Sequence, residues 1–473
     1  MKRPLALLLL LTALASPAAA APRPAAPGST DTLRLSLEQA VERALENGTA
    51  MQAARAGVGI ARGRIVEARS EALPSVTGTV GYNRKFDSIF RGVTDTDTSG
   101  LGDLFANTPF GAVHGWNLDV TARQLLWSGG RVGAGLQAAH AVIRSALSDR
   151  DQTAADVTLA TQNAYWNALY ARAVVGIARE GRDRAREHLR QVELLHRQGS
   201  RSEYDLLQAQ VDAANQEPLV VDARAAADLA LLELKRALGL PLAQPLVLET
   251  PLAFGATLPV PVPEGTPGDA SRRPAVLGAD AMVEARQAAL RAERAGWWPE
   301  LAATATVSHQ AFPADGTPER TQFQRSVDAT VRLEWPLFTG FRTLGSVQRA
   351  SQELVLARAQ REETRRRAEV ELAKARLGVD QALATLVARR GTARLAERAH
   401  HLAEVRWRNG LATQLEVSDA RLRMQNAQVH EVLALKDYRL SLARLERAAG
   451  TPIATRDRSL DELAQELPPR EDD

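Results

Sequence analysis

The chain carries Trp127-Ser128-Gly129-Gly130-Arg131, and 211 positions later it carries Phe338-Thr339-Gly340-Phe341-Arg342. Gly and Pro punctuate local structure, so repeated matches of these residues at one offset are not expected by chance. The sequence therefore predicts a two-fold internal repeat. The same offset of 211 relates Gly199 to Gly410, Gly239 to Gly450, and Pro241 to Pro452.

The residues around each pentapeptide predict the same order of elements in both halves. Alternating apolar and polar residues before each pentapeptide are typical of strands, and the Pro-free stretch after it is typical of a long helix. Each long helix is followed by a tight turn, near Gly199 or Gly410, and by a further helix. We expect a first repeat at 22–240 and a second at 274–452, with strands at about 75–86, 113–127, 300–312 and 325–338.

Each repeat opens with a helix of its own, and two segments lie outside the repeats. The first helix is expected to run unbroken from Ser36, which has a capping-box spacing with Gln39, to about Leu73. Segment 241–273 is rich in Pro and is expected to be a linker with little regular structure. Segment 453–473 is expected to be an acidic C-terminal tail.

The N-terminus resembles an export signal. Lys2 and Arg3 precede a short apolar run, and Ala18 to Ala21 offer a cleavage site, so we interpret residues 1–21 as a secretory signal peptide. No later stretch is apolar for 18 residues, and we expect no transmembrane helix in the mature chain. An exported chain of this kind is either soluble outside the cytoplasm or held in a membrane by β-strands.

Composition excludes several functional classes. The 59 basic and 56 acidic residues leave a net charge of +3, and this near balance does not predict a basic surface for nucleic acid. The chain has no Cys, which excludes disulfides, cysteine zinc sites and a Cys nucleophile. It also lacks a phosphate loop, a Gly-x-Ser-x-Gly motif and a His-Glu-x-x-His motif. We expect no enzymatic activity, no cofactor and no metal site.

The expected strands each have one apolar and one polar face. A soluble domain with a sheet packed on helices would explain this, as would a membrane barrel with lipid outside and water inside. Four strands cannot close a barrel, so a membrane sheet would need strands from several chains. Aromatic residues gather at the strand ends, where an interfacial belt would lie: Trp116, Trp127, Trp297, Trp298, Trp335 and Phe338.

With these features in place, the chain resembles the TolC family of outer-membrane efflux proteins. The resemblance rests on Leu35 to Ala40 with Leu45-Glu46-Asn47, on the two pentapeptides, and on the doubled glycine turns. It implies an α+β membrane protein in which four strands per chain form a trimeric 12-stranded outer-membrane barrel, continued by a long α-helical coiled-coil tunnel in the periplasm. Lipoprotein members carry an N-terminal Cys, which this chain lacks, so its anchoring would rest on the barrel alone.

The resemblance also implies a function and partners. The homotrimer would be the passive exit duct of a tripartite efflux or type I secretion system, extending from the outer membrane into the periplasm. It would dock to a periplasmic adaptor (membrane fusion protein) and an inner-membrane pump. The alternative is a soluble periplasmic coiled-coil scaffold or adaptor, although an adaptor normally has one helical hairpin rather than two.

The two glycine turns lie a whole long helix away from the strands and should form the far periplasmic tips. By resemblance, these tips are the docking surface for the adaptor; the alternative is that their residues only cap helices. The docking candidates are Arg197, Gly199 and Ser200 in the first turn, and Arg408, Gly410 and Leu411 in the second.

Acidic residues just after the turns are candidates for a gate. Glu416 and Asp419 lie three apart, hence on one helix face, and Asp205 follows the first turn. In a trimer each would form a ring of three carboxylates, and acidic rings select cations. The resemblance implies that the positions of Glu416 and Asp419 line the constricted periplasmic entrance. The alternative is that these acids stabilise helix N-termini.

Other polar residues near the tips have less specific interpretations. Arg201 and Trp407 are secondary candidates for contacts that hold the tips closed. The adjacent pair His400-His401 is expected on a solvated helix face, since neighbouring side chains on a helix diverge. His188 and His196 are too far apart to bind one metal ion.

Overall fold

The computed structural model describes residues 32–87, 112–250, 257–261, 270–313, 316–452 and 455–459, together with Leu463. The expected signal peptide lies outside these residues. The described chain is mostly helical, with a few strands. Of its helices, none combines the length and apolarity that a bilayer crossing requires.

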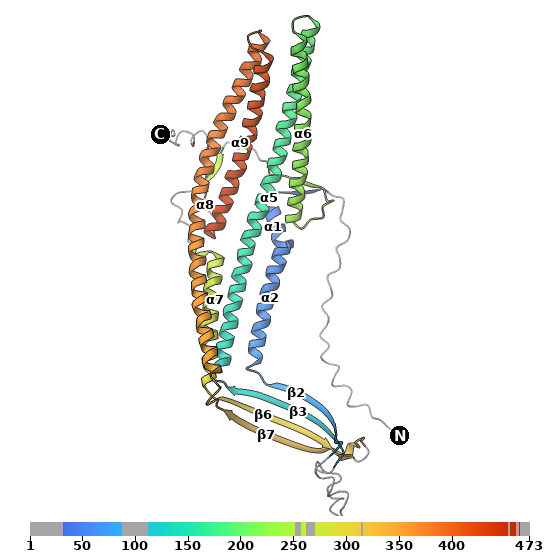
Figure 1. Cartoon of the computed structure of the whole chain (residues 1–473), viewed down its shortest axis with the longest axis vertical. Helices are drawn as coiled ribbons and strands as arrows, with labels where there is room; N and C mark the ends of the chain where they lie inside the picture. Colours follow the sequence, from blue (N-terminus) through green and yellow to red (C-terminus); the bar gives the residue numbers. More distant parts are fainter. Residues whose placement is uncertain are drawn as a thin grey trace, which may run out of the picture.

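Four long helices form two hairpins that stand side by side (Figure 1). The first hairpin consists of α5 (Arg131–Arg197) and α6 (Glu203–Ala237), and the second of α8 (Arg342–Arg408) and α9 (Gln414–Ala449). Both turns lie at one end of the molecule, and the sheet lies at the other. Since α5 and α8 each have 67 residues, each extends about 100 Å.

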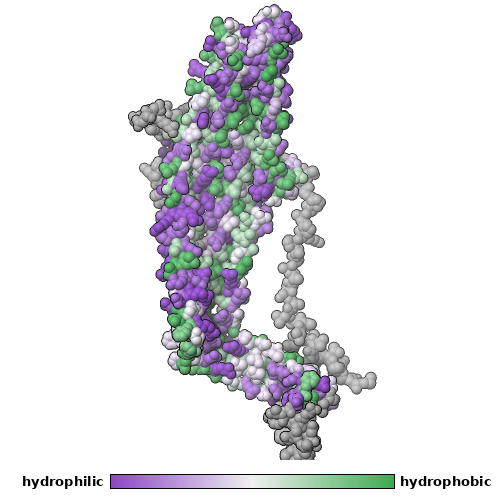
Figure 2. Space-filling view, viewed as in Figure 1, coloured by the Kyte–Doolittle hydropathy of each residue, from purple (hydrophilic) through white to green (hydrophobic). Residues whose placement is uncertain are grey.

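Two shorter helices complete the column next to the sheet. Helix α2 (Thr49–Ser70) packs against α5, while α7 (Pro274–Arg294) packs against both α5 and α8. Each of them directly precedes a strand of the sheet, as the repeat predicts. Figure 2 shows hydrophilic residues over much of the visible surface of the column.

Along α8, buried residues recur at an interval of seven. A seven-residue period keeps one seam of a helix facing its partner. The seam starts with aliphatic side chains and ends, close to the second turn, with a histidine and a tryptophan: Leu372, Val379, Leu386, Ala393, His400 and Trp407.

The main sheet has four antiparallel strands in the order β2-β3-β6-β7. They are β2 (Ser75–Arg84), β3 (His114–Trp127), β6 (Glu300–Ala311) and β7 (Gln324–Glu334). Strands β2 and β7 are its two edges, and a register shift lies between Leu125 and Trp127.

The register places apolar and polar residues on opposite faces of this sheet. Rows such as Val76–Ala122–Ala305–Ala329 and Gly78–Val120–Val307–Val327 define what we call the apolar face. The alternate rows define the polar face, for example Thr79–Asp119–Ser308–Ser326. No described helix covers the apolar face, because Val76, Val80 and Val331 remain more than two-thirds exposed.

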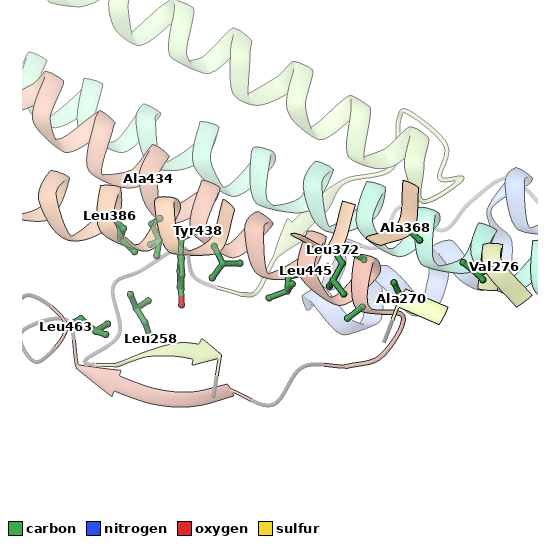
Figure 3. Packing of buried hydrophobic residues seen from close by; sticks show 14 residues of the cluster. Leu258, Ala270, Val276, Ala368, Leu372, Leu386, Ala434, Tyr438, Leu445 and Leu463 are labelled. Carbon is green, nitrogen blue, oxygen red and sulfur yellow. The ribbon is translucent and has the colours of Figure 1, made fainter. Parts of the chain in front are cut away.

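Each half of the chain buries a core of its own. The first core joins residues of α1, α5 and α6 to two short strands, β1 (Leu33–Leu35) and β4 (Leu246–Leu248), which pair in parallel. The second core lies between α8 and α9 and is covered by the antiparallel pair of β5 (Thr257–Pro261) and β8 (Thr455–Ser459) (Figure 3). There the Tyr438 hydroxyl donates to the Pro259 carbonyl at 2.6 Å.

Three expectations about secondary structure are wrong. The first helix is broken at Gly48 into α1 (Leu37–Asn47) and α2, and a Cβ there would lie 2.3 Å from the Ala44 carbonyl oxygen. The segment 241–273 is not without regular structure, since it contains β4, β5 and a 3-10 turn at Ala270–Arg272. Part of the expected tail forms β8, so the chain has more strands than the four expected.

Candidate functional site at the two helical tips

The two tips have the same backbone hydrogen bonds. In the first, the Ser200 amide donates to the Leu195 carbonyl at 2.8 Å, and in the second the Leu411 amide donates to the Arg406 carbonyl at 2.8 Å. This six-residue closure ends a helix with a left-handed residue. Gly199 and Gly410 occupy that position, each with φ of 74°. Glycine is required there because a Cβ would strain the backbone.

The docking candidates lie on the surface of these turns. Arg197, Ser200 and Arg408 are exposed, and 68% of the Leu411 surface remains exposed. The structure thus presents two similar turns, each with an arginine at the end of the preceding helix. Their adaptor-docking role stays a prediction.

Two of the gate candidates take part in helix capping. Ser202 and Thr413 are the N-caps of α6 and α9, and each forms a capping box with the acid three residues on. In the first box, Ser202 donates to Oδ2 of Asp205 through its amide and its hydroxyl, at 3.3 and 2.9 Å. In the second, Thr413 donates to Oε1 of Glu416 at 3.3 and 3.2 Å. Each cap engages one carboxylate oxygen.

Asp419, the third gate candidate, has a different environment. It lies one turn after Glu416 and pairs with Arg423 at 2.8 Å on the exposed surface of α9. An exposed pair of this kind contributes little to stability. Asp419 is therefore the gate candidate whose charge is least tied to the fold of its own helix.

Arg201 and Trp407, from different tips, are in direct contact. The Arg201 guanidinium lies 4.9 Å from the Trp407 ring centroid and also donates to the Trp407 carbonyl at 3.1 Å. Trp407 is 2% exposed and belongs to a small apolar cluster with Val192 of α5 and Val417 of α9. This cluster joins the two hairpins just below their turns.

A buried polar cluster continues the contact between the hairpins, and no motif in the sequence indicates it. His188 of α5 is hydrogen-bonded to Gln414 of α9 at 2.5 Å, and its ring is tilted against that of Trp407, with ring centroids 4.5 Å apart. On α6, Asp212 accepts a hydrogen bond from the Ser418 hydroxyl and lies 3.7 Å from the buried Arg421. The cluster therefore links α5 and α6 to α9.

His400 corrects one expectation. It is 5% exposed and faces Glu404 at 3.4 Å, so the expected solvated face holds for His401 but is wrong for His400. The seven-residue seam through Leu386 and Ala393 would have placed His400 inside. Adjacent histidines hide this signal, because only one of the two can lie on the seam.

Burial shifts the titration of this cluster. Loss of hydration lowers the pKa of His188, and the positive charge of Arg421 lowers it further, while the hydrogen bond with Gln414 opposes the shift. Burial also lowers the pKa of His400 and of Arg421. The cluster is therefore most favourable with both histidines neutral.

A close approach of three helices lies next to this cluster. Gln216 of α6 accepts a hydrogen bond from Gln425 of α9 at 3.1 Å, and both side chains are 7% exposed. The Gln425 amide lies against Gly181 of α5, where a Cβ would be 1.4 Å from its Nε2 atom. Gly181 thus provides the space that this interhelical hydrogen bond occupies.

The aromatic residues expected at strand ends lie at two levels. Trp127, Trp297, Trp298, Trp335 and Phe338 surround the junction of sheet and helices, where Trp127 and Trp298 pack edge to face at 6.5 Å. Trp116 lies at the opposite end of the strands, 4.9 Å from the Tyr82 ring.

Comparison with known proteins identifies the family. The model of the outer membrane efflux protein family matches residues 40–240 and 270–451, which is most of the chain. The chain belongs to the outer membrane efflux protein family. This membership confirms the resemblance inferred from the sequence and the expected location in the outer membrane.

One relative in the efflux family is the pyoverdine export outer membrane protein OpmQ of Pseudomonas aeruginosa. It is 30% identical over 289 residues, which cover 59% of this chain and 57% of OpmQ. The match therefore spans little more than half the length of that relative.

Solved structures resemble the fold over a larger part of the chain. The outer membrane protein VceC from Vibrio cholerae has a TM-score of 0.72 at 20% identity, with 88% of this chain and 96% of VceC covered. The CmeC outer membrane channel of Campylobacter jejuni has a TM-score of 0.70 at 17% identity, with 91% and 88% covered. At these identities the likeness concerns the fold.

Proposed function

We propose that three copies of the chain form a passive exit duct through the outer membrane. The observation that carries this proposal is the four-stranded sheet, whose apolar face no described helix covers and whose edges, β2 and β7, pair with no further strand of the described residues. Unpaired strand edges are costly in lipid, and only a closed ring of strands removes them. Strands β7 and β2 point in opposite directions, so the antiparallel order continues from one copy to the next, and three sheets of four strands give twelve.

The strand lengths suit a membrane of ordinary thickness. The strands have 10 to 14 residues, and a tilted membrane strand needs about 9–11. Trp116 and Trp127 mark the two aromatic levels on β3 and are 11 positions apart, or roughly 36 Å along the strand. A tilt of about 40° reduces this to roughly 28 Å, close to the height of a barrel's apolar band.

We further propose that the long helices continue the barrel as a tunnel in the periplasm. The two hairpins have identical turn geometry at residues 211 apart, which supports the two-fold repeat of 22–240 and 274–452. Three copies would supply six hairpins around one axis. The protein would then act as a channel rather than an enzyme.

At the far end, the exposed turns with Arg197 and Arg408 would dock a periplasmic adaptor that connects the duct to an inner-membrane pump. This arrangement defines a tripartite efflux or type I secretion system. Two chemically similar turns per copy fit repeated binding of one adaptor. Exposure at both turns supports this proposal.

We also propose that Glu416 and Asp419, with Asp205, surround the entrance of the tunnel. Each would contribute a ring of three carboxylates, which attracts divalent cations. Asp205 and Glu416 keep one carboxylate oxygen that their capping hydrogen bonds do not use. The contact of Arg201 with Trp407 would hold the two hairpins together while the entrance is narrow.

The experiment that tests the duct is the detergent-corrected mass of the mature protein extracted from the outer-membrane fraction. A mass of three chains supports a shared barrel, and conductance in planar bilayers should follow. A soluble monomer in the periplasm would overturn the proposal, because four strands cannot close alone.

A further inference from the structure

The geometry points to a binding site for a phosphorylated lipid headgroup on the apolar face of the sheet, at the end remote from the helices. This inference rests on the proposed membrane sheet. It concerns the position of the charged residues on that face. A passive duct does not itself require charged residues there.

The charged residues of the two faces are distributed differently. On the polar face, acids and bases occur together, for example Arg123 with Glu300 at 3.5 Å. On the apolar face, the described strands carry neither Asp nor Glu, and every ionisable side chain except one tyrosine is basic. These basic residues are Arg84, His114, His309 and Arg325.

All of these basic residues lie at the same end of the strands. Arg84 ends β2 directly opposite His114, which begins β3. His309 lies near the end of β6, directly opposite Arg325 near the start of β7. The rest of the apolar face, toward the helices, consists mainly of Val, Ala and Leu. The charge therefore forms a band at the end of the apolar face remote from the helices, where His309 and Arg325 share the row of Leu118 and the pair of Arg84 and His114 lies four positions further along β3.

The level of this band can be calculated from strand geometry. Arg325 and Trp335 lie on the same side of β7 and are ten positions apart, or roughly 33 Å along the strand. With a tilt of about 40°, Arg325 lies roughly 25 Å above the aromatic level at the helix junction, which is about the full height of a barrel's apolar band. Its guanidinium would thus lie at the phosphates of the leaflet remote from the periplasmic helices.

The pair of His309 and Arg325 has the chemistry to hold a phosphate. Directly opposed residues of an antiparallel pair have Cβ atoms about 5 Å apart, so one anion can contact both side chains. Arg325 is exposed, and the described residues offer it no ion-pair partner, although a guanidinium fork suits a phosphate. Leu118 beside His309 continues the apolar surface on which acyl chains would lie.

Aromatic packing next to the band supports a fixed surface. The Tyr82 hydroxyl is hydrogen-bonded to Nδ1 of His114 at 2.8 Å, and Trp116 donates to the Gly316 carbonyl at 2.9 Å. Hydrogen bonds thus hold Tyr82 and Trp116 beside His114, and amphipathic rings favour the headgroup level.

The test uses the full-length protein in nanodiscs of phosphatidylcholine doped with diphosphorylated lipid A, or with the same glycolipid after its phosphates are removed. Native mass spectrometry counts the glycolipid retained per assembly. The variant is R325Q/H309Q, with R325Q alone as a milder form, and the matched control is R332Q, which changes an arginine of the same strand on the polar face.

We expect the wild-type protein and R332Q to retain the phosphorylated glycolipid equally, and R325Q/H309Q to bind it at least about tenfold more weakly. Equal retention by R325Q/H309Q, or equal retention of the dephosphorylated glycolipid, would overturn the site while leaving the duct intact. Displacement by millimolar inorganic phosphate would also overturn it, because the ligand would then be a free anion rather than a lipid. A protein that does not enter the nanodiscs would overturn the duct and the site together.

Discussion

Replacing Gly181 by alanine should loosen the junction between the two helical hairpins. The new Cβ would lie 1.4 Å from Nε2 and 2.6 Å from Cδ of Gln425, so that this buried side chain must move. Its hydrogen bond to Gln216 would then be lost. Overpacking costs about 2 kcal/mol and a buried unpaired amide about 2 kcal/mol, while the better helix propensity of alanine returns about 1 kcal/mol. The net loss is about 3 kcal/mol.

Hydrogen exchange in α9 measures this loss at the place where it occurs. A decrease of about 3 kcal/mol in the free energy of local opening corresponds to roughly hundredfold faster exchange of the backbone amides near Gln425. The matched control is Gly176→Ala on the same helix, where no heavy atom lies within 4 Å of the added Cβ. That control should leave exchange unchanged or slightly slower.

The same substitution in a protein that lacks the Gln425 side chain tests whether the collision with Gln425 is the cause. In a Gln425→Ala protein, Gly181→Ala should cost almost nothing, because the side chain with which it collides is gone. The reasoning is refuted if Gly181→Ala exchanges like the Gly176→Ala control, or if its cost persists without Gln425. In planar bilayers, Gly181→Ala alone should raise the open probability.

Three further changes test the tips. The double variant Glu416→Ala/Asp419→Ala should weaken divalent-cation block of the conductance, and unchanged block would show that these acids do not line the entrance. Lowering the pH from 7.5 to 5.5 should lower the melting temperature, because burial lowers the pKa of His188 and the unfolded chain therefore binds the proton more readily than the folded chain. The free energy of unfolding should begin to decrease below about pH 6.5, by at most about 1.4 kcal/mol per pH unit. His188→Gln should reduce this pH dependence, and His401→Gln, at an exposed position, should not. Equal slopes of melting temperature against pH in the two variants would contradict the assignment of the effect to His188. Arg201→Ala removes the cation–π contact across the tips and should increase conductance severalfold, whereas an unchanged conductance would mean that this contact does not restrain the hairpins.

The sequence predicts the large elements because their signals are local and repeated. Apolar and polar residues alternate strictly from Ser326 in strand β7 to Trp335 just after it, and the glycines of both turns lie where a left-handed residue is needed. The short strands were missed for the opposite reason. Strand β5 has five residues, two of them proline, and its partner β8 lies almost 200 positions later. Such pairs are fixed by tertiary packing rather than by local pattern.

The candidate site divides in the same way. The glycine turns and the acidic residues after them follow from short motifs, and the structure shows that Asp205 and Glu416 form capping boxes at α6 and α9, in line with the alternative role considered for these acids. The buried cluster of His188, Asp212 and Arg421 could not be read from any motif, because its members come from three helices. Of the residues near this cluster, only His400 has a sequence feature that indicates burial. That feature is its place in the seven-residue repeat of α8, not its position next to His401.

The separation of the two cores has a consequence for how the chain matures. All residues of the first core lie between Leu35 and Leu248, and all residues of the second lie between Leu258 and Leu463. A polypeptide that emerges amino end first can therefore complete one hydrophobic centre before the other has left the export machinery. The contacts between the halves must wait for the second half, chiefly those of α5 with α7 and α9 and the pairing of β3 with β6. Each half can thus fold its own core before the two halves dock. This shortens the time for which apolar surface is exposed and can aggregate.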